Sequence, residues 1–221
     1  MLSSLDGLRL VAFDLDGTLI DSVPDLAAAV DAMLIERELS PAGEARVRDW
    51  VGNGSHKLVE RALEYATGSP PNEQAVDSAH DSFLEHYGRA SCVHTRVYPG
   101  VNEALSALNE RGLVLVVITN KPHAFVAPIL DALGLAGYFG LTLGGDSLPQ
   151  KKPDPAPLLH VAKHYGISPG ECLMIGDSRH DIEAGRRAGF HTLAVPYGYN
   201  HGEPITDSQP DGIVESLREL V

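Results

Sequence analysis

The stretch "VAFDLDGTLIDS", residues 11–22, decides the fold of this chain. It begins with the apolar run Val11-Ala12-Phe13, which is typical of a strand buried on both faces. The run ends abruptly at two acidic residues, Asp14 and Asp16, followed by a glycine-threonine turn. The pattern predicts a buried strand that delivers two carboxylates to one edge of the protein core.

Further apolar runs rich in Val, Ile and Leu follow along the chain, and they are continuous rather than alternating. Continuous runs favour strands of a parallel sheet, which is covered on both faces. Because amphipathic helical patterns separate the later runs, we predict an α/β fold with a Rossmann-like, doubly wound parallel sheet. The expected strands are 8–13, 113–119, 141–144, 172–176 and 192–195, and the expected helices are 101–111, 123–133, 155–165, 179–188 and 211–220.

The segment that follows the first strand contains helical patterns and no convincing strand. Three apolar stripes at helical spacing indicate three or four packed helices. We therefore predict that residues 22–94 form an all-helical domain, inserted into a core built from residues 1–21 and 95–221. The stripes are Ala27, Val30, Met33 and Leu34; Leu58, Val59, Ala62, Leu63 and Ala66; and Val76, Ala79, Phe83 and Tyr87.

The composition excludes several classes of function. Against 17 Lys and Arg stand 30 Asp and Glu, a net charge of -13, and no basic run offers a surface for nucleic acid or anionic lipid. The longest apolar stretch, 113–118, is far shorter than the ~20 residues that span a bilayer. Cys92 and Cys172 lack CxxC spacing, so we expect a cytoplasmic protein without disulfides.

The residues just past each predicted strand should decide the chemistry, because ligands of open parallel sheets bind at the carboxyl ends of the strands. Four loops are expected to bring carboxylates, a hydroxyl and a lysine to one edge. The candidates are Asp14 and Asp16 after the first strand, Thr119, Asn120 and Lys121 after the second, Lys152 in "KKPDP" beyond the third, and Asp177 and Asp181 in "GDSRHD" after the fourth.

These residue types suit phosphoryl transfer through an aspartyl-phosphate. A carboxylate that attacks a phosphate dianion meets like-charge repulsion, so the site needs a divalent cation and a further positive group. Mg²⁺ is expected, because it is a hard ion held by carboxylates, carbonyls and waters. We expect Asp14 to be the nucleophile and a metal ligand, and Asp177 to be a second ligand. Thr119 and Lys152 are expected to bind the phosphoryl group, with Asn120 beside them in the substrate site.

Asp16 is expected to be the general acid and base, since the leaving alkoxide must gain a proton and the hydrolytic water must lose one. Nearby negative charge should favour its protonation, so the metal is expected to contact its backbone carbonyl rather than its carboxylate. We expect Asp181 to position Lys152 rather than to bind the metal directly. Asp21 is expected to cap or hinge the connection into the helical insert.

The turn "GNGSHK", residues 52–57, leaves two interpretations open, because it lacks the GK[ST] of a Walker loop and follows a helix. It is either an ordinary turn between helices, or a turn whose free backbone N–H groups receive the non-reacting end of the substrate. Gly54, Lys57 and Arg61 are the substrate-binding candidates on the second interpretation. The segment 197–211, rich in turn formers, is expected to be a surface loop.

Together, "DLDGT", "TN", "KKPDP" and "GDSRHD" resemble, in order and spacing, the four motifs of the haloacid dehalogenase superfamily. The match spans about residues 9–196, and the helical insert is similar to the cap of that superfamily's helical-cap phosphatases. The resemblance implies that Asp14 is the nucleophile and that Asp16 is the acid/base and a Mg²⁺ ligand through its main chain. It also implies that Thr119 and Lys152 bind phosphate and that Asp177 binds the metal. The implied roles coincide with those expected from the residues.

Within the superfamily, "DSVPDLAAAV", "VGNG" and "KKPDPAPLL" are most similar to bacterial phosphoglycolate phosphatases. This likeness implies hydrolysis of 2-phosphoglycolate to glycolate and phosphate. The dehalogenase branch is disfavoured, because those enzymes lack the second acid that Asp16 supplies. The alternative is a phosphatase or phosphomutase for another small sugar phosphate, which the motifs do not separate from the first choice.

A phospho-accepting signalling receiver is the alternative from another class, since it also combines an Asp acceptor, an acidic pair, a Thr and a Lys around Mg²⁺. It is disfavoured because the acceptor here lies at the end of the first strand and a large insert follows it. The expected partner is a small anionic phosphate ester, bound by a monomer or homodimer that contacts neither nucleic acid nor membrane.

Overall fold

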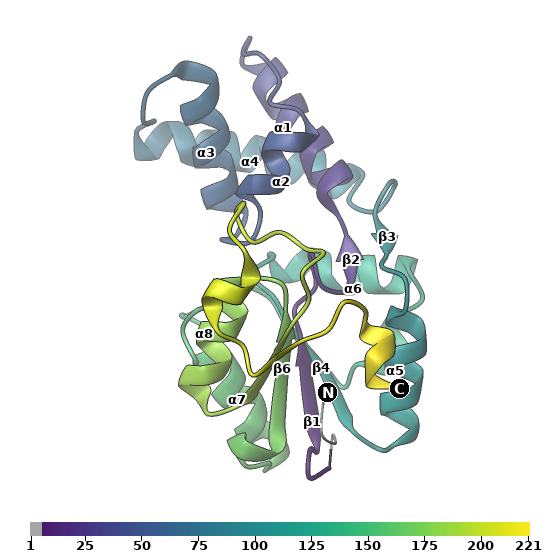
Figure 1. Cartoon of the computed structure of the whole chain (residues 1–221). Coiled ribbons are helices and arrows are strands. Elements are labelled where there is room, and N and C mark those ends of the chain that lie inside the picture. Colours follow the sequence, from purple (N-terminus) through teal and green to yellow (C-terminus); the bar gives the residue numbers. More distant parts are fainter. Residues whose placement is uncertain (1–5) are drawn as a thin grey trace.

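The computed structural model describes residues 6–221, so residues 1–5 of the predicted core segment 1–21 lie outside the described residues. A six-stranded parallel sheet forms the centre, with strands β1 (Leu10–Phe13), β4 (Val114–Ile118), β5 (Leu141–Leu143), β6 (Cys172–Gly176), β7 (His191–Ala194) and β8 (Gly212–Ile213). Its strand order is β5-β4-β1-β6-β7-β8, which places β1 between β4 and β6 (Figure 1). The predicted α/β fold with a doubly wound parallel sheet is confirmed.

Alternate side chains of β1 belong to different layers of the protein. Val11 and Phe13 pack in one apolar cluster and Leu10 and Ala12 pack in another, and all four are completely buried. A strand covered on both faces accepts an apolar side chain at every position, which explains the continuous run in the sequence. The covering helices are α5 (Val101–Glu110) and α6 (His123–Ala132) on one face and α7 (Ala156–Tyr165) and α8 (Arg179–Ala188) on the other.

Four more helices pack together beyond the end of the sheet, and they come from the chain between β1 and β4 (Figure 1). Their predicted apolar stripes are buried, except for the partly exposed Ala66. The division of the chain into a core and a helical domain stays a prediction. None of the helices within residues 6–221 combines the length and apolarity needed to cross a membrane. The four helices are α1 (Val23–Glu36), α2 (Glu44–Trp50), α3 (Ser55–Thr67) and α4 (Glu73–Arg89).

A short antiparallel ribbon, β2 (Ile20–Asp21) and β3 (Arg96–Val97), forms the two chain crossings between the sheet and these helices (Figure 1). Asp25, in the first turn of α1, connects the chain that enters the four helices to residues 93–95, where the chain leaves them. Its carboxylate accepts hydrogen bonds of 2.7–3.0 Å from the backbone N–H groups of residues 93–95 and from the hydroxyl of Thr95. Asp25 is only 3% exposed, so its carboxylate depends on these donors rather than on water.

The predicted helix over 211–220 is wrong. The chain forms β8 there, which pairs with the edge strand β7, followed by a short 3-10 helix over Leu217–Leu220. Asp211 accepts hydrogen bonds from the backbone N–H and the hydroxyl of Thr192, which anchors the segment beside the sheet. Unpaired backbone groups at a sheet edge attract another strand, and this attraction outweighs the local helical pattern.

We expect Asp25→Asn to lower the free energy of unfolding by about 2 kcal/mol, because one of the two acceptor oxygens becomes an NH₂ that cannot accept from the N–H groups of residues 93–95. Burial opposes ionisation of Asp25, but the hydrogen bonds from Thr95, His94 and Val93 outweigh it and lower the pKa. A lowered pKa in the folded state stabilises the fold above the ordinary pKa of Asp, and this contribution is lost as the pH falls through the lowered value. Urea unfolding should therefore show the largest difference between wild type and variant near neutral pH.

The difference should narrow as the pH falls below the ordinary Asp value of about 4. The matched control is Asp81→Asn, which changes an exposed carboxylate of α4 and should leave the unfolding midpoint unchanged. A difference between wild type and Asp25→Asn that does not depend on pH would contradict the role given to the carboxylate.

Candidate active site

Strand-end loops meet above β1, because β4, β1 and β6 are neighbours in the sheet. Asp14 follows β1, Thr119 follows β4, Asp177 follows β6, and Lys152 comes from the loop between β5 and α7. All four side chains are buried. The order of the strands thus brings together residues that lie in four separate motifs of the sequence.

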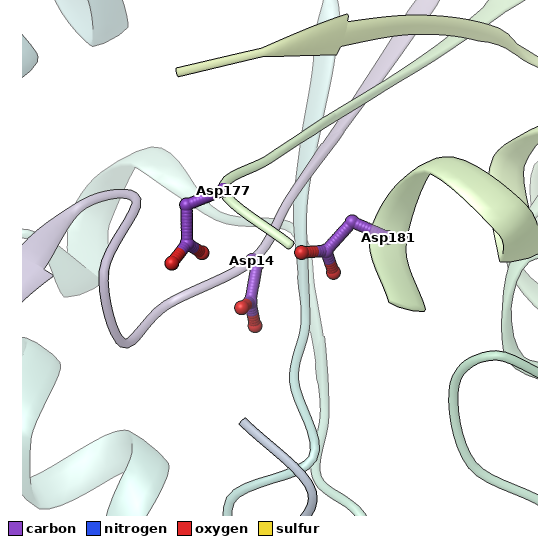
Figure 2. Close-up of side chains that lie close together, drawn as sticks. All are labelled: Asp14, Asp177 and Asp181. Atoms are coloured by element: carbon purple, nitrogen blue, oxygen red, sulfur yellow. The ribbon is translucent and has the colours of Figure 1, made fainter. Parts of the chain in front are cut away.

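Three carboxylates share one space at this edge. The side chains of Asp14, Asp177 and Asp181 point toward one another (Figure 2), and each has an oxygen within 4.8 Å of an oxygen of the other two. Asp177 also accepts a hydrogen bond of 3.0 Å from the hydroxyl of Thr18. Carboxylate oxygens are the ligands that a hard divalent cation such as Mg²⁺ prefers, so this donor set fits such an ion.

Lys152 supplies an ammonium group to this carboxylate cluster. Its Nζ lies 2.8 Å from Oδ1 of Asp14 and 2.6 Å from Oδ1 of Asp181. The other oxygen of Asp181 accepts hydrogen bonds from the backbone N–H and the hydroxyl of Ser178. These bonds form a capping box at the N-terminus of α8. Asp181 is therefore fixed by the helix that it starts, with its remaining oxygen toward Lys152.

The cluster buries more carboxylate than ammonium charge. Burial is the largest influence on Asp14 and raises its pKa to about 7, although Lys152 acts in the opposite direction. Burial, together with Asp14 and Asp181, raises the pKa of Asp177 well above its ordinary value. Burial alone would lower the pKa of Lys152, but the carboxylates of Asp14 and Asp181 raise it. Asp14 and Asp177 ionise together near neutral pH only when further positive charge is close, which is a second argument for a cation at this position.

Asp16 makes its hydrogen bonds with groups outside the carboxylate cluster. The hydroxyl of Ser22 donates to it at 2.5 Å, and Nζ of Lys121 donates to its two oxygens at 3.0 and 3.2 Å. We expected negative charge beside Asp16, but its direct partner is a buried cation, because the loop after β4 carries Lys121 alongside it. The sequence places Lys121 at this strand end, directly after Thr119 and Asn120, but gives it no specific role.

Thr119 and Asn120 border the site from the loop after β4. The Thr119 hydroxyl oxygen accepts from the backbone N–H of Lys121 at 3.2 Å, so its own proton stays available for a ligand. Nδ2 of Asn120 donates to the backbone oxygens of Gly52 at 3.0 Å and of Lys152 at 2.9 Å. Asn120 thereby ties the turn before α3 to two loops of the sheet.

A cavity of about 40 Å³ lies between the strand-end loops and helices α1, α3 and α4. One part of its wall is polar, and the other part is largely apolar. The polar part comprises Asp14, Asp16, Thr119, Asn120 and Lys121, and the apolar part includes Leu26, Val51, Leu58, Phe83, Tyr87 and Phe125.

The turn "GNGSHK" contributes backbone rather than charged side chains to this cavity. Gly52 and Gly54 line it. Lys57 instead pairs with Glu60 on the exposed surface of α3, at 2.7 Å. Arg61 donates to the backbone oxygen of Trp50 at 2.6 Å and so ties α3 to α2. Of the three candidates in this region, the structure brings only Gly54 to the cavity.

The first residues of the segment 197–211 border the site, whereas most of 202–210 is exposed, as expected for a surface loop. Tyr199 is 3% exposed, its backbone N–H donates to Asp177 at 2.5 Å, and its hydroxyl donates to Asp21 in β2, also at 2.5 Å. Glycines allow this approach, because a Cβ on Gly198 would lie 2.3 Å from Asp177 and one on Gly17 2.2 Å from it. The chain takes this path because it returns to the sheet edge as β8.

Comparison with known proteins identifies the family of this chain and several similar proteins. The family model described as haloacid dehalogenase-like hydrolase matches residues 8–189. A phosphoglycolate phosphatase of Pseudomonas fluorescens (strain Pf0-1) is 50% identical over 214 residues, which cover 96% of this chain and 78% of the relative. A phosphoglycolate phosphatase of Escherichia coli (strain K12) is 45% identical over 236 residues, which cover 100% of this chain and 94% of the relative.

A solved structure agrees over almost the whole chain. The crystal structure of a predicted phosphoglycolate phosphatase from Haemophilus somnus 129PT superposes with a TM-score of 0.93 at 39% identity and covers 98% of both chains. The resemblance stated from the four motifs is therefore confirmed. Since the family model and these relatives span most of its length, this chain belongs to the haloacid dehalogenase-like hydrolases.

Proposed function

We propose that this chain is a Mg²⁺-dependent phosphatase that converts 2-phosphoglycolate to glycolate and phosphate through a phospho-Asp14 intermediate. The observation that carries the proposal is the buried contact of Asp14 with Lys152 and the carboxylate cluster, at the wall of a cavity that Asp16 also lines. The names of the relatives from Pseudomonas fluorescens and Escherichia coli support the choice of substrate.

In the first step, an oxygen of Asp14 attacks phosphorus and the bond from phosphorus to the glycolate oxygen breaks. Lys152 and the free proton of the Thr119 hydroxyl stabilise the phosphoryl oxygens, with Asn120 beside them. Asp14, Asp177 and the backbone carbonyl of Asp16 would hold Mg²⁺, which would supply positive charge against the negative charge of the transferring group.

Asp16 moves the two protons that the reaction requires. It donates one to the departing glycolate oxygen and later accepts one from the water that attacks phospho-Asp14. Its position suits both steps, because it lies two residues from the nucleophile and lines the same cavity. Asp181 holds Lys152 in place through their 2.6 Å contact.

The size of the cavity supports a small substrate. The cavity is small, at about 40 Å³, which favours a compact leaving group over a sugar. The N-terminus of α3 follows Gly54 without a side-chain cap, and its backbone N–H groups are available to an anionic substrate.

In this proposal residues 22–94 act as a cap that excludes bulk water. Both cysteines are free thiols, in keeping with a cytoplasmic enzyme.

Activity with a matched pair of variants tests the chemistry. With Mg²⁺, we expect the wild type to release phosphate from 2-phosphoglycolate and to hydrolyse p-nitrophenyl phosphate. Asp14→Asn should lower kcat by at least about 10³-fold, because the nucleophile is lost. Asp207→Asn, at an exposed position, should keep the wild-type rate. A clear preference for a sugar phosphate in a panel of esters would overturn the choice of substrate, and no turnover of any ester would favour a phospho-accepting receiver.

Thermal unfolding tests the metal without relying on activity. Mg²⁺ at about tenfold over its Kd should raise the Tm of the wild type by about 3–6 °C, because it binds only the assembled carboxylate cluster. Asp177→Asn should respond by less than about 1 °C, since one ligand is lost. Asp207→Asn should respond like the wild type. An equal response of Asp177→Asn and wild type would place the ion elsewhere.

A further inference from the structure

A second buried lysine borders the cavity, and the phosphoryl transfer proposed above gives it no role. We propose that Lys121, together with the hydroxyl of Tyr87, is the receptor for the carboxylate of the substrate. The pair would make the site selective for small phosphate esters that carry a second anionic group. This inference rests on the proposed function and extends it to the end of the substrate that does not react.

The two buried lysines have different partners. Lys152 is engaged by two carboxylates, at 2.8 and 2.6 Å, and so belongs to the nucleophile. Lys121 is engaged by one carboxylate, that of Asp16, and by the face of the Tyr87 ring, 4.7 Å from its centre. Because an ammonium has three N–H donors and Asp16 takes at most two of them, Lys121 keeps donor capacity beside the cavity that it lines.

Tyr87 provides an independent indication of a ligand. It is 1% exposed and lines the cavity, and its O–H donates to no group within residues 6–221, because its polar neighbour Lys121 is an ammonium that can only donate. Its ring is fixed by stacking on Phe83 at 5.7 Å and by an edge contact with Phe125 at 5.0 Å. Burial raises its pKa to about 12, so the hydroxyl stays protonated and can donate. A buried donor without a partner is expected where a ligand supplies the acceptor.

The remaining wall explains why the receptor selects for charge. Leu26, Leu58, Phe83 and Phe125 offer no hydrogen bonds from their side chains, so a neutral polar group here would lose its water without full replacement. A carboxylate would instead meet an ammonium and a hydroxyl donor, which are the stronger kind of partner for an anion. Asp14 and Lys121 line the same cavity, so one small ester can present its phosphate to the nucleophile and its carboxylate to the ammonium.

Two substrates that differ at one group test the inference. We compare 2-phosphoglycolate with 2-hydroxyethyl phosphate, which has CH₂OH in place of the carboxylate, and measure kcat/KM for both. The ratio of the two values reports selection for the anionic group. In Lys121→Met the ratio should fall by about 10–100-fold, because one charge-assisted contact is lost. In Tyr87→Phe it should fall by about 3–10-fold, because one neutral donor is lost.

Controls separate the possible failures. Lys163→Met removes an exposed lysine of α7 and should keep the wild-type ratio. If Lys121→Met slows both esters equally, the lysine acts only on Asp16 and the inference is wrong. If Lys121→Met does not fold, Tyr87→Phe decides, since it removes one oxygen and keeps the ring; an unchanged ratio then overturns the inference. If the wild type hydrolyses neither ester, the proposed function fails, whereas hydrolysis of both with unchanged ratios in the variants overturns the inference alone.

Discussion

The burial of three carboxylates beside one ammonium, at the end of the central strand, is the constraint on which the rest of this structure depends. Such an excess of negative charge is unfavourable for folding unless hydrogen bonds and positive charge offset it. Hydrogen-bond donors offset part of this charge: Ser178, three residues away at the start of α8, donates to Asp181, and Thr18 and the backbone N–H of Tyr199 donate to Asp177. The same excess of negative charge favours the binding of a divalent cation. The carboxylate cluster therefore destabilises the fold but suits phosphoryl transfer.

The carboxylate cluster also explains the arrangement of positive charge around the cavity. Lys152 is held between Asp14 and Asp181, and Lys121 is held by Asp16. Each lysine therefore faces a different part of the site, although both are almost fully buried. In the proposed reaction this separation assigns one cation to the phosphoryl group and the other to the leaving group. Helices α1, α3 and α4 complete the enclosure with largely apolar side chains, which strengthens the electrostatic interactions inside it.

Much of the fold could be predicted from the sequence, because the decisive signals are local. A strand buried on both faces shows a continuous apolar run, and each motif lies directly after its strand, so the sheet edge could be expected to collect Asp14, Thr119, Lys152 and Asp177. The errors concern segments whose partners are distant in the chain. Residues 211–220 have a helical pattern, yet Gly212 and Ile213 pair with the open edge of β7 and form β8.

The sequence by itself determined the parallel sheet, the helices and the set of residues at the strand ends, since periodicity and spacing reflect burial on each element. Only the tertiary structure decided that Lys121 pairs with Asp16, 105 residues away, that Tyr199 reaches Asp177, and that Lys57 and Arg61 stay outside the cavity. The physical reason is that the spacing of apolar residues along one helix or strand reveals which of its faces is buried. The partner of a buried charge, in contrast, depends on which loops the packed strands bring within hydrogen-bond distance.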